Sequence, residues 1–311
     1  MAVVRTARRA LVLGIGGGGD VVGALAVARL CEALGTPFVL GGVAWERIAI
    51  DPRPGPRPLA EIRDARPLGD AAAFAGPDTA TAQGVPFAEA GMAAHLGTET
   101  VLIDVSRGAP GAAVGITAAL DELACDLLIC VDVGGDVLAR GGEPGLASPL
   151  CDAVMVAAAL EVAARVKPVL GVIGPGCDGE LTPAEVLGRV AELARAGAGM
   201  GAWGVTPQTA DELEAATSRV PTEASLQVVR CARGEVGDAY IRGGRRRVEL
   251  GAVGALAFFF DLLAAEKALP LARAVAGAGS IGAASDALAA EGVRTELEYE
   301  RSRAAGARGT S

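Results

Sequence analysis

The sequence predicts an α/β fold of the doubly wound, Rossmann-like type, in which helices cover both faces of a mostly parallel sheet. Short, continuously apolar runs recur along the first two thirds of the chain, as expected for strands that are buried on both faces. Longer segments with apolar residues at helical spacing separate these runs. A tight-turn signal and an Ala-rich end further predict a C-terminal β-hairpin elaboration and a helical C-terminus.

The elements of the α/β core follow in chain order. Residues 10–15 are predicted as the first strand and residues 21–34 as the first helix, which ends at Gly35, a typical helix stop. The Pro-rich segment 51–67 is predicted to be an extended loop. Further buried strands are predicted at 38–43, 100–105, 126–133 and 168–173, and further helices at 80–96, 113–123, 149–165 and 183–196.

The last third of the sequence has a different pattern. The runs 238–242 and 245–250 flank Gly243 and Gly244, a dipeptide typical of tight hairpin turns. The apolar segment 252–263 is predicted as a helix, and one or two further helices follow from about residue 270. No internal repeat or clean linker interrupts the chain. We therefore predict a single domain over residues 1–303 and a disordered tail over residues 304–311.

Composition excludes several classes of protein. Of the 311 residues, 51% are hydrophobic and 21% are charged, which excludes a disordered chain. The formal net charge of −9 is unfavourable for binding a phosphate backbone, so we expect no nucleic-acid partner. His95 is the only histidine. A His-rich metal site is therefore excluded, and any Ser-His-Asp triad would have to use this residue.

The expected location is the cytoplasm. No segment has the pattern of a signal peptide, and no apolar run reaches the roughly 18 residues that a membrane span needs, so we expect no membrane partner. The six cysteines form no C-x-x-C pair and are interpreted as reduced, mostly buried thiols. The sequence leaves a homo-oligomer open.

A glycine-rich loop directly follows the first predicted strand and opens the first helix. It consists of Gly16, Gly17, Gly18, Gly19 and Asp20. Without side chains, backbone N–H groups can approach an anion, and the helix N-terminus adds the positive end of its dipole. The loop predicts contact with a phosphate or a nucleotide. The alternative is a tight strand-to-helix turn with Asp20 as the N-cap.

A second candidate segment follows the second strand. Trp45, Glu46 and Arg47 precede a Pro-rich stretch that contains Arg57. A Trp ring beside a Glu–Arg pair and a stiff, Pro-rich loop suggests a rigid surface against which a ligand could bind. The arginines can bind a carboxylate or phosphate bidentately. The alternative is a solvated loop with surface arginines.

Acidic residues follow three further strands. Asp104 ends one strand, Asp132 and Asp136 end the next, and Asp178 and Glu180 follow the one after. Because ligands of open α/β sheets bind beyond the carboxyl ends of the strands, we expect these side chains to meet at one edge. Asp132, Asp136 and Asp178 are the candidate ligands of a metal, and oxygen ligands favour Mg²⁺.

The candidate general acids and bases are Asp132, Asp136, Asp178, Glu180 and Glu46, and Asp104 is a candidate for binding the ligand. The alternative is that each acidic residue only caps the helix that follows it. Two further segments are candidates for completing the site. Ser148 precedes a proline at a predicted helix start, and Thr222 with Glu223 precedes the hairpin. For Ser148, plain helix capping is the alternative interpretation.

Five segments together resemble a known family. They are GIGGGGDVVGA, GGVAWERIAIDPRPGPR, VDVGGDVLARGGEPGLASPLCDAVM, GPGCDGEL and PTEAS, and the chain resembles the domain of unknown function 1152 family over residues 11–261. The resemblance implies a Rossmann-like α/β fold. It implies no particular reaction.

We expect an enzyme that binds a small anionic, phosphorylated or nucleotide-like molecule at the glycine loop. The carboxylates, with Mg²⁺ as a candidate cofactor, would support hydrolysis or group transfer. One alternative is metal-free lyase, cyclase or dehydratase chemistry on a carboxylic acid, and another is a regulator that binds the ligand without turnover. An oxidoreductase is a weaker alternative, because nothing downstream of the glycine loop confirms a dinucleotide site.

Overall fold

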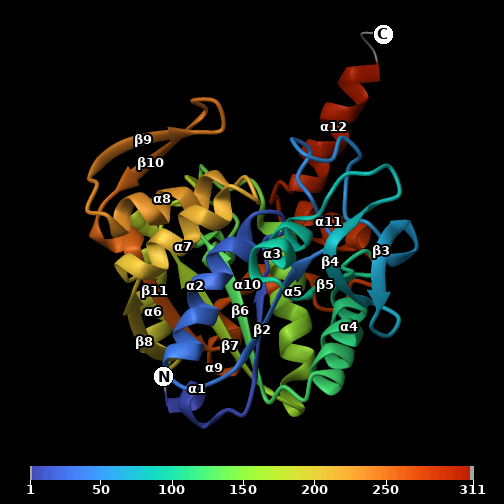
Figure 1. Ribbon diagram of the computed structural model, residues 1–311. Helices are drawn as coiled ribbons and strands as arrows, with labels where there is room; N and C mark the ends of the chain where they lie inside the picture. Colours follow the sequence, from blue (N-terminus) through green and yellow to red (C-terminus); the bar gives the residue numbers. More distant parts are fainter. Residues whose placement is uncertain (1, 309–311) are drawn as a thin grey trace.

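The computed structural model describes residues 2–308, and its centre is a nine-stranded sheet (Figure 1). The strands of this sheet are β1 (Ala10–Gly14), β2 (Phe38–Val43), β3 (Ile62–Pro67), β4 (Ala72–Thr81), β5 (Thr100–Ile103), β6 (Leu127–Val133), β7 (Lys167–Ile173), β8 (Gly199–Gly204) and β11 (Leu256–Asp261). Their order across the sheet is β3-β4-β5-β2-β1-β6-β7-β11-β8.

The five central strands, β5, β2, β1, β6 and β7, are parallel. From β1 the chain moves to β2, passes through the outer strands β3 and β4 to β5, and later crosses back to β6, on the other side of β1. The carboxyl ends of β1 and β6 therefore lie side by side where the strand order reverses. In open α/β sheets this is the position at which ligands bind. The predicted mostly parallel, Rossmann-like sheet is confirmed.

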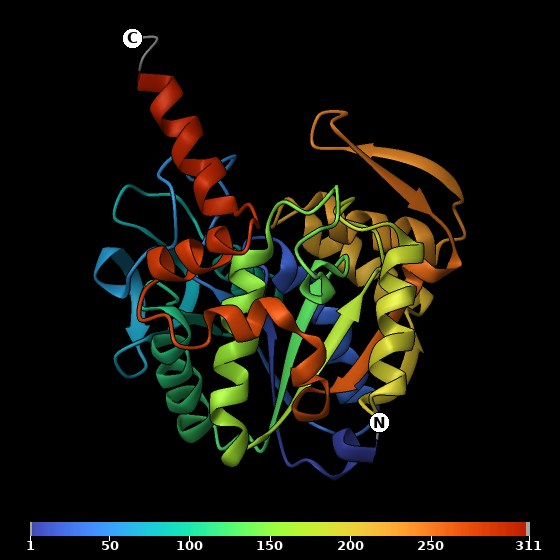
Figure 2. The same ribbon diagram turned by 180° about the vertical axis from the view of Figure 1, so that it is seen from behind.

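Helices cover both faces of the sheet, as the views from opposite sides show (Figures 1 and 2). One layer contains α2 (Asp20–Ala33), α3 (Ala88–Leu96), α7 (Pro207–Thr217) and α8 (Glu223–Ala232). The other contains α4 (Gly108–Glu122), α5 (Pro149–Glu161), α10 (Pro270–Val275), α11 (Ile281–Ala290) and the start of α12 (Glu296–Arg308). The remaining helices are α1 (Ala2–Thr6), α6 (Pro183–Arg195) and α9 (Leu262–Ala265).

The core follows from the two-residue period of the strands. In β1, Leu11 and Leu13 pack under the α4–α5 layer, whereas Ala10 and Val12 pack under the α2 layer. All five residues of this strand are buried, which explains the continuously apolar run in the sequence.

Four strands that the sequence did not predict pair antiparallel at the two sides of the parallel core. β3 lies inside the predicted loop 51–67, and β4 extends into the predicted helix 80–96, so α3 begins only at Ala88. β11 replaces the predicted helix 252–263 and pairs with both β7 and the Gly-rich β8. A short apolar run such as LAFFFD fits a strand and a buried helix equally well, which explains that error.

The predicted hairpin is confirmed: β9 (Gly237–Ile241) and β10 (Arg246–Leu250) pair antiparallel. The loop between them spans four residues, and Arg242, Gly243 and Gly244 have φ values of 55°, 66° and 83°. The hairpin and α12 rise on either side of one end of the molecule (Figures 1 and 2), the end at which the parallel strands finish.

The C-terminal helix corrects part of the predicted disordered tail. α12 continues to Arg308, so residues 304–308 are helical. Residues 309–311 lie outside the described residues.

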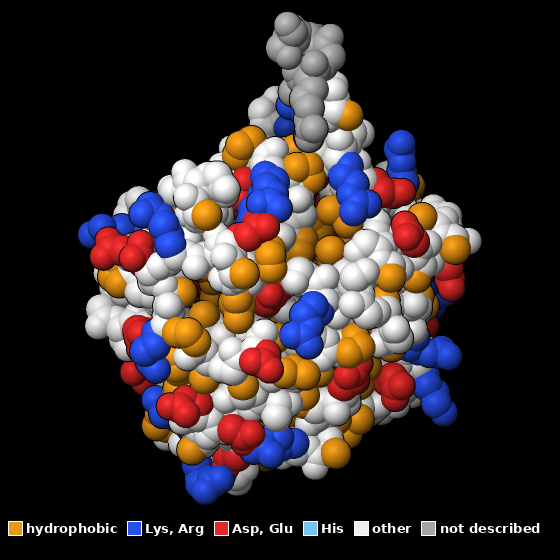
Figure 3. Space-filling view, turned by 90° about the vertical axis from the view of Figure 1, so that its right-hand side faces the viewer, with side chains coloured by type: hydrophobic (Ala, Val, Ile, Leu, Met, Phe, Trp, Pro, Cys, Tyr) orange, Lys and Arg blue, Asp and Glu red, His pale blue; other side chains and the backbone are white. Residues whose placement is uncertain are grey.

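The described helices include none that is both long and apolar enough to cross a membrane. Acidic and basic side chains are interspersed on the face shown in Figure 3, so this face presents no continuous strip of one charge.

Candidate functional site

A cavity of about 450 Å³ opens beyond the carboxyl ends of β1 and β6. Most of the predicted site residues line it: Gly16, Gly17, Gly18, Gly19, Asp20, Glu46, Arg47, Asp136, Ser148, Asp178, Glu180, Thr222 and Glu223. Residues that the sequence analysis did not select also line it, among them Asp152 and Arg242. The topology brings these residues together from loops that lie far apart in the sequence.

The glycine loop forms one wall of the cavity. The Gly16 N–H donates to Asp20 Oδ2 at 3.0 Å, and the Gly18 N–H donates to the carbonyl oxygen of Trp45 at 3.0 Å. Gly19 is the N-cap of α2. Because glycine has no side chain, it cannot accept a hydrogen bond from the N–H groups of the first helical turn. Asp20 is thus the first residue of α2, and its carboxylate binds the loop.

Close packing requires glycine at position 19. A Cβ atom there would lie 2.3 Å from the Cβ of Thr222, which is the N-cap of α8. The start of α8 therefore contacts the glycine loop directly, which places Thr222 and Glu223 at the cavity. Glu223 in turn accepts hydrogen bonds from the backbone N–H of Arg242 at 2.9 and 3.0 Å.

Six carboxyl groups form two triplets at the site. Asp20, Asp132 and Asp152 each place one carboxylate oxygen within 4.8 Å of the other two, and so do Asp136, Asp178 and Glu180. The predicted metal ligands Asp132, Asp136 and Asp178 are therefore divided between the two triplets. Asp132 lies beneath the cavity lining and is 1% exposed.

The first triplet is strongly desolvated. Burial raises the pKa of Asp20 to about 7, although Arg47 opposes the shift. Burial and the charge of Asp20 raise the pKa of Asp132 to about 8. Burial and the charge of Asp132 raise the pKa of Asp152 well above its ordinary range. Oδ1 of Asp152 is buried and has no hydrogen-bond partner among the described residues.

In the second triplet, one carboxylate accepts several hydrogen bonds, whereas the other two are repelled by neighbouring negative charge. Glu180 accepts from Arg246 Nη1 at 2.7 Å, from the N–H groups of Ala147 and Ser148, and from the Ser148 hydroxyl. Although burial opposes ionisation, Arg246 holds the pKa of Glu180 below its usual value. Burial, and then the charge of Glu180, raise the pKa values of Asp136 and Asp178 well above their usual range.

The hydroxyl of Ser148 thus donates to Glu180. Although Ser148 is the N-cap residue of α5, its side chain accepts no capping hydrogen bond from that helix.

Glu46 faces the glycine loop from the loop that follows β2. Its Oε1 accepts the N–H of Ala88 at 2.6 Å, and burial raises its pKa to about 7. Glu89 lies behind it, 1% exposed, and neither of its carboxylate oxygens has a hydrogen-bond partner among the described residues. Burial, and then the charge of Glu46, raise the pKa of Glu89 well above its usual range.

Arg47 lies over the glycine loop. Its guanidinium donates to the carbonyl oxygen of Gly16, forms an ion pair with Glu296 at 3.4 Å, and lies 5.1 Å from the ring centroid of Trp45. This arrangement fixes a positive charge in the wall of an acidic cavity. It also ties the site to α12, from which Glu296 comes.

Three residues that we predicted at the ligand site lie outside the cavity lining. Trp45 is fully buried, and its indole N–H donates to Glu300 Oε2 at 3.1 Å. Arg57 is buried and donates to Asp51 Oδ2 at 2.7 Å. Asp104 accepts the N–H groups of Leu59 and Ser106 at 3.0 and 2.8 Å. Through these bonds all three hold loops in place, and the structure does not bring them to the cavity with the other predicted residues.

The missed residues Asp152 and Glu89 lie in the first turns of α5 and α3. An acidic residue in the first turn of a helix is usually a favourable partner of the helix dipole, so neither stood out in the sequence. For Asp152 a signal did exist. The helix that follows β6 begins at the same edge of the sheet as the glycine loop, so its first turn belongs to that edge.

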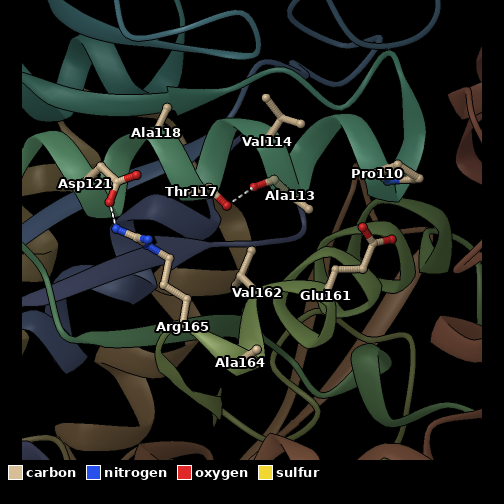
Figure 4. A pocket seen from close by; sticks show the side chains of 10 residues that line it. All are labelled: Pro110, Ala113, Val114, Thr117, Ala118, Asp121, Glu161, Val162, Ala164 and Arg165. Atoms are coloured by element: carbon tan, nitrogen blue, oxygen red, sulfur yellow. Dashed lines mark hydrogen bonds and ion pairs between the residues drawn. The ribbon is translucent and has the colours of Figure 1, made fainter.

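A second hollow, of about 510 Å³, lies between α4 and the end of α5 (Figure 4). Its lining is mostly apolar, and the charged residues Asp121 and Arg165 pair with each other across it. It contains none of the converging carboxylates or the glycine loop. The cavity beyond β1 and β6 is thus the better candidate for chemistry.

Comparison with known proteins gives one result. A family model described as "Protein of unknown function (DUF1152)" matches residues 11–304. No curated protein and no solved structure matches the chain significantly.

Proposed function

We propose that this chain, which belongs to the DUF1152 family of proteins of unknown function, is an enzyme that hydrolyses or transfers a group of a small phosphorylated molecule with the help of Mg²⁺. The observation that carries the proposal is the convergence of six carboxyl groups beside a glycine-rich helix N-terminus. Neither feature alone indicates this chemistry. Their combination in one cavity is what a cation-assisted phosphate site requires.

Electrostatics supports a bound cation. The cavity lining carries Asp20, Glu46, Asp136, Asp152, Asp178, Glu180 and Glu223 against Arg47 and Arg242. Burial makes the ionised forms of these carboxyls costly, and a cation that enters with an anionic ligand offsets both that cost and the repulsion between ionised carboxylates and the anion. Carboxylate oxygens suit Mg²⁺, and Asp136 and Asp178 are the members of the second triplet least satisfied by protein donors. When bound, Mg²⁺ would neutralise charge on a phosphoryl group.

The chain's own groups then have separable tasks. The N–H groups at the start of α2 would bind phosphate oxygens, as helix N-termini do elsewhere. Arg47 and Arg242, at the cavity wall, would orient the anionic ligand. Glu46 would accept or donate a proton, because burial places its pKa at about 7, where both forms are populated at neutral pH.

One observation favours a second candidate function. Burial and neighbouring negative charge raise the pKa values of both Asp132 and Asp136, so these buried carboxyls can hold a proton that an isolated carboxylate would release. Such a pair performs acid–base chemistry without a metal. This arrangement fits the metal-free lyase, cyclase or dehydratase alternative on a carboxylic acid substrate.

A thermal-shift panel with the full chain tests the proposal. Mg²⁺, Mn²⁺ and Ca²⁺ are crossed with sugar phosphates, nucleotides, pyrophosphate and carboxylic acids, each with and without chelator. A ligand that binds only the folded state raises Tm by mass action. We expect a cation-dependent shift with a phosphorylated compound, followed by turnover of that compound.

Two variants test whether the thermal shift and the turnover depend on the carboxylates of the cavity. Asp178→Asn should abolish both the shift and the turnover, whereas Asp286→Asn, on the exposed face of α11, should keep both. A shift by carboxylic acids that ignores chelator would favour the metal-free candidate. Tight binding of a phosphorylated compound with no product would favour the non-catalytic regulator.

A further inference from the structure

We infer that the cavity holds two divalent cations, the second bound by Asp20, Asp132 and Asp152. The inference deepens the proposed function and rests on it for the first cation, at Asp136 and Asp178. It names a second metal position and narrows the ligand to one that two cations can bind together.

An unpartnered oxygen marks the second position. Asp152 is 2% exposed, lines the cavity from the first turn of α5, and has no hydrogen-bond partner for Oδ1 among the described residues. Leaving a buried carboxylate oxygen without a partner is costly, and a coordinated cation removes that cost.

Each of the other two carboxylates of the triplet has one oxygen that accepts a backbone hydrogen bond. Asp20 Oδ2 accepts the Gly16 N–H at 3.0 Å, and Asp132 Oδ2 accepts the Gly135 N–H at 2.8 Å. One oxygen of each therefore binds the protein, which orients the side chain. One oxygen of each carboxylate in the triplet lies within 4.8 Å of the other two, and such an all-oxygen donor set suits Mg²⁺ or Mn²⁺.

Among the described residues, no basic side chain forms an ion pair with this triplet. Arg47 acts electrostatically on Asp20 and Asp152, but its guanidinium donates to the Gly16 carbonyl and pairs with Glu296. Glycine at position 16 keeps the space open. A Cβ atom there would lie 2.5 Å from Asp20 Oδ2 and 3.2 Å from Asp152 Oδ2.

The two triplets adjoin at the end of β6. Asp132 of the first triplet lies in this strand, and Asp136 of the second follows it four positions later. Two-cation sites that act on phosphates hold their metals roughly 3.5–4 Å apart, a spacing that phosphate oxygens span. The ligand class is therefore a phosphomonoester or a diphosphate, with its phosphoryl oxygens shared between the cations.

Calorimetric titration of the full chain with Mn²⁺ tests the inference. We expect two Mn²⁺ per wild-type chain, one per chain for Asp152→Asn, and two for the control Asp286→Asn. Asp20→Asn removes a ligand of the same cation at the cavity surface, and it gives the same test if Asp152→Asn does not fold. Thermal unfolding in chelator checks that each variant is folded.

The outcomes separate this inference from the proposed function. One Mn²⁺ per wild-type chain, with cation-dependent turnover of a phosphorylated compound, would overturn the second position and leave the proposed function standing. No Mn²⁺ on the wild type would overturn both. Two Mn²⁺ on a folded Asp152→Asn variant would overturn the assignment of the second cation to this triplet.

Discussion

Buried carboxyl groups are the feature that sets this protein apart at the scale of single residues. The charge of the carboxylates at the cavity can be neutralised by a bound cation or ligand, but Glu89 does not line the cavity. It lies behind Glu46, and a Cβ atom on Gly42 would come within 2.0 Å of its Oε1. Burial, and then the charge of Glu46, therefore raise the pKa of Glu89 well above its usual range, which favours its neutral form.

Glu89 therefore gives a pH-dependent stability. The unfolded chain releases this proton above the ordinary pKa of 4.5, whereas the folded chain keeps it well above that value. The stabilising effect is fully present below pH 4.5 and is lost as the pH rises through the folded pKa. Glu89→Gln, which cannot ionise, should be more stable than wild type at pH 8 by about 1–3 kcal/mol.

Urea unfolding at pH 5 and pH 8 measures this difference. The matched control is Glu122→Gln, at the exposed end of α4, which should follow the wild type at both pH values. Equal pH dependence of Glu89→Gln and wild type would show that Glu89 ionises freely in the folded protein.

Glu46 makes a separate prediction for activity. Burial raises its pKa to about 7, so its ionised fraction increases as the pH passes that value. If it accepts a proton during turnover, kcat should rise through about pH 7 in the wild type. Glu46→Gln should lose about 10²–10⁴-fold in kcat and lack that rise. A Glu46→Gln enzyme with the wild-type pH profile would exclude this role.

At the scale of elements, the site depends on contacts between segments that are distant in the sequence. The glycine loop is held against the start of α8 at Gly19 and Thr222, and against the β2 loop through Gly18 and Trp45. From α12, Glu300 accepts the Trp45 indole N–H and the Gly55 N–H. The C-terminal helix thus fixes the loop that carries Glu46 and Arg47.

The Gly19–Thr222 contact can be tested by adding one methyl group. Gly19→Ala would place Cβ 2.3 Å from the Thr222 Cβ, so we expect a loss of about 1–3 kcal/mol of stability. Thr222→Gly should restore part of it by removing the clashing atom. The control, Gly188→Ala in α6, meets open space and should stabilise the protein by about 0.5–1 kcal/mol.

These variants are compared by urea unfolding. A Gly19→Ala protein as stable as the wild type would show that α8 moves freely relative to the glycine loop.

At the scale of the whole molecule, the sequence predicts the parallel core and misses its antiparallel flanks. Strands β1, β2, β6 and β7 are buried on both faces, so their apolar runs stand out. β3 is a half-exposed edge strand with charged residues, and β8 is glycine-rich and largely exposed. Their sequences resemble loops, because their strand pairing depends on a neighbour that a local pattern does not include.

The same limit applies to the site. Residues that directly follow β1, β6 and β7 could be predicted, since the carboxyl ends of parallel strands meet at one edge. Trp45 and Arg57 could not be placed, because their roles depend on Glu300 and Asp51. Glu300 lies 255 positions away from Trp45 in the chain, beyond any motif.

The most direct test of the central claim is a crystal structure of the wild-type protein grown with Mn²⁺ and pyrophosphate, with anomalous data collected at the manganese edge. We expect a manganese peak bound by the cavity carboxylates, and pyrophosphate oxygens at the first turn of α2. A cavity that holds only water, or pyrophosphate bound elsewhere without manganese, would contradict a cation-assisted phosphate site.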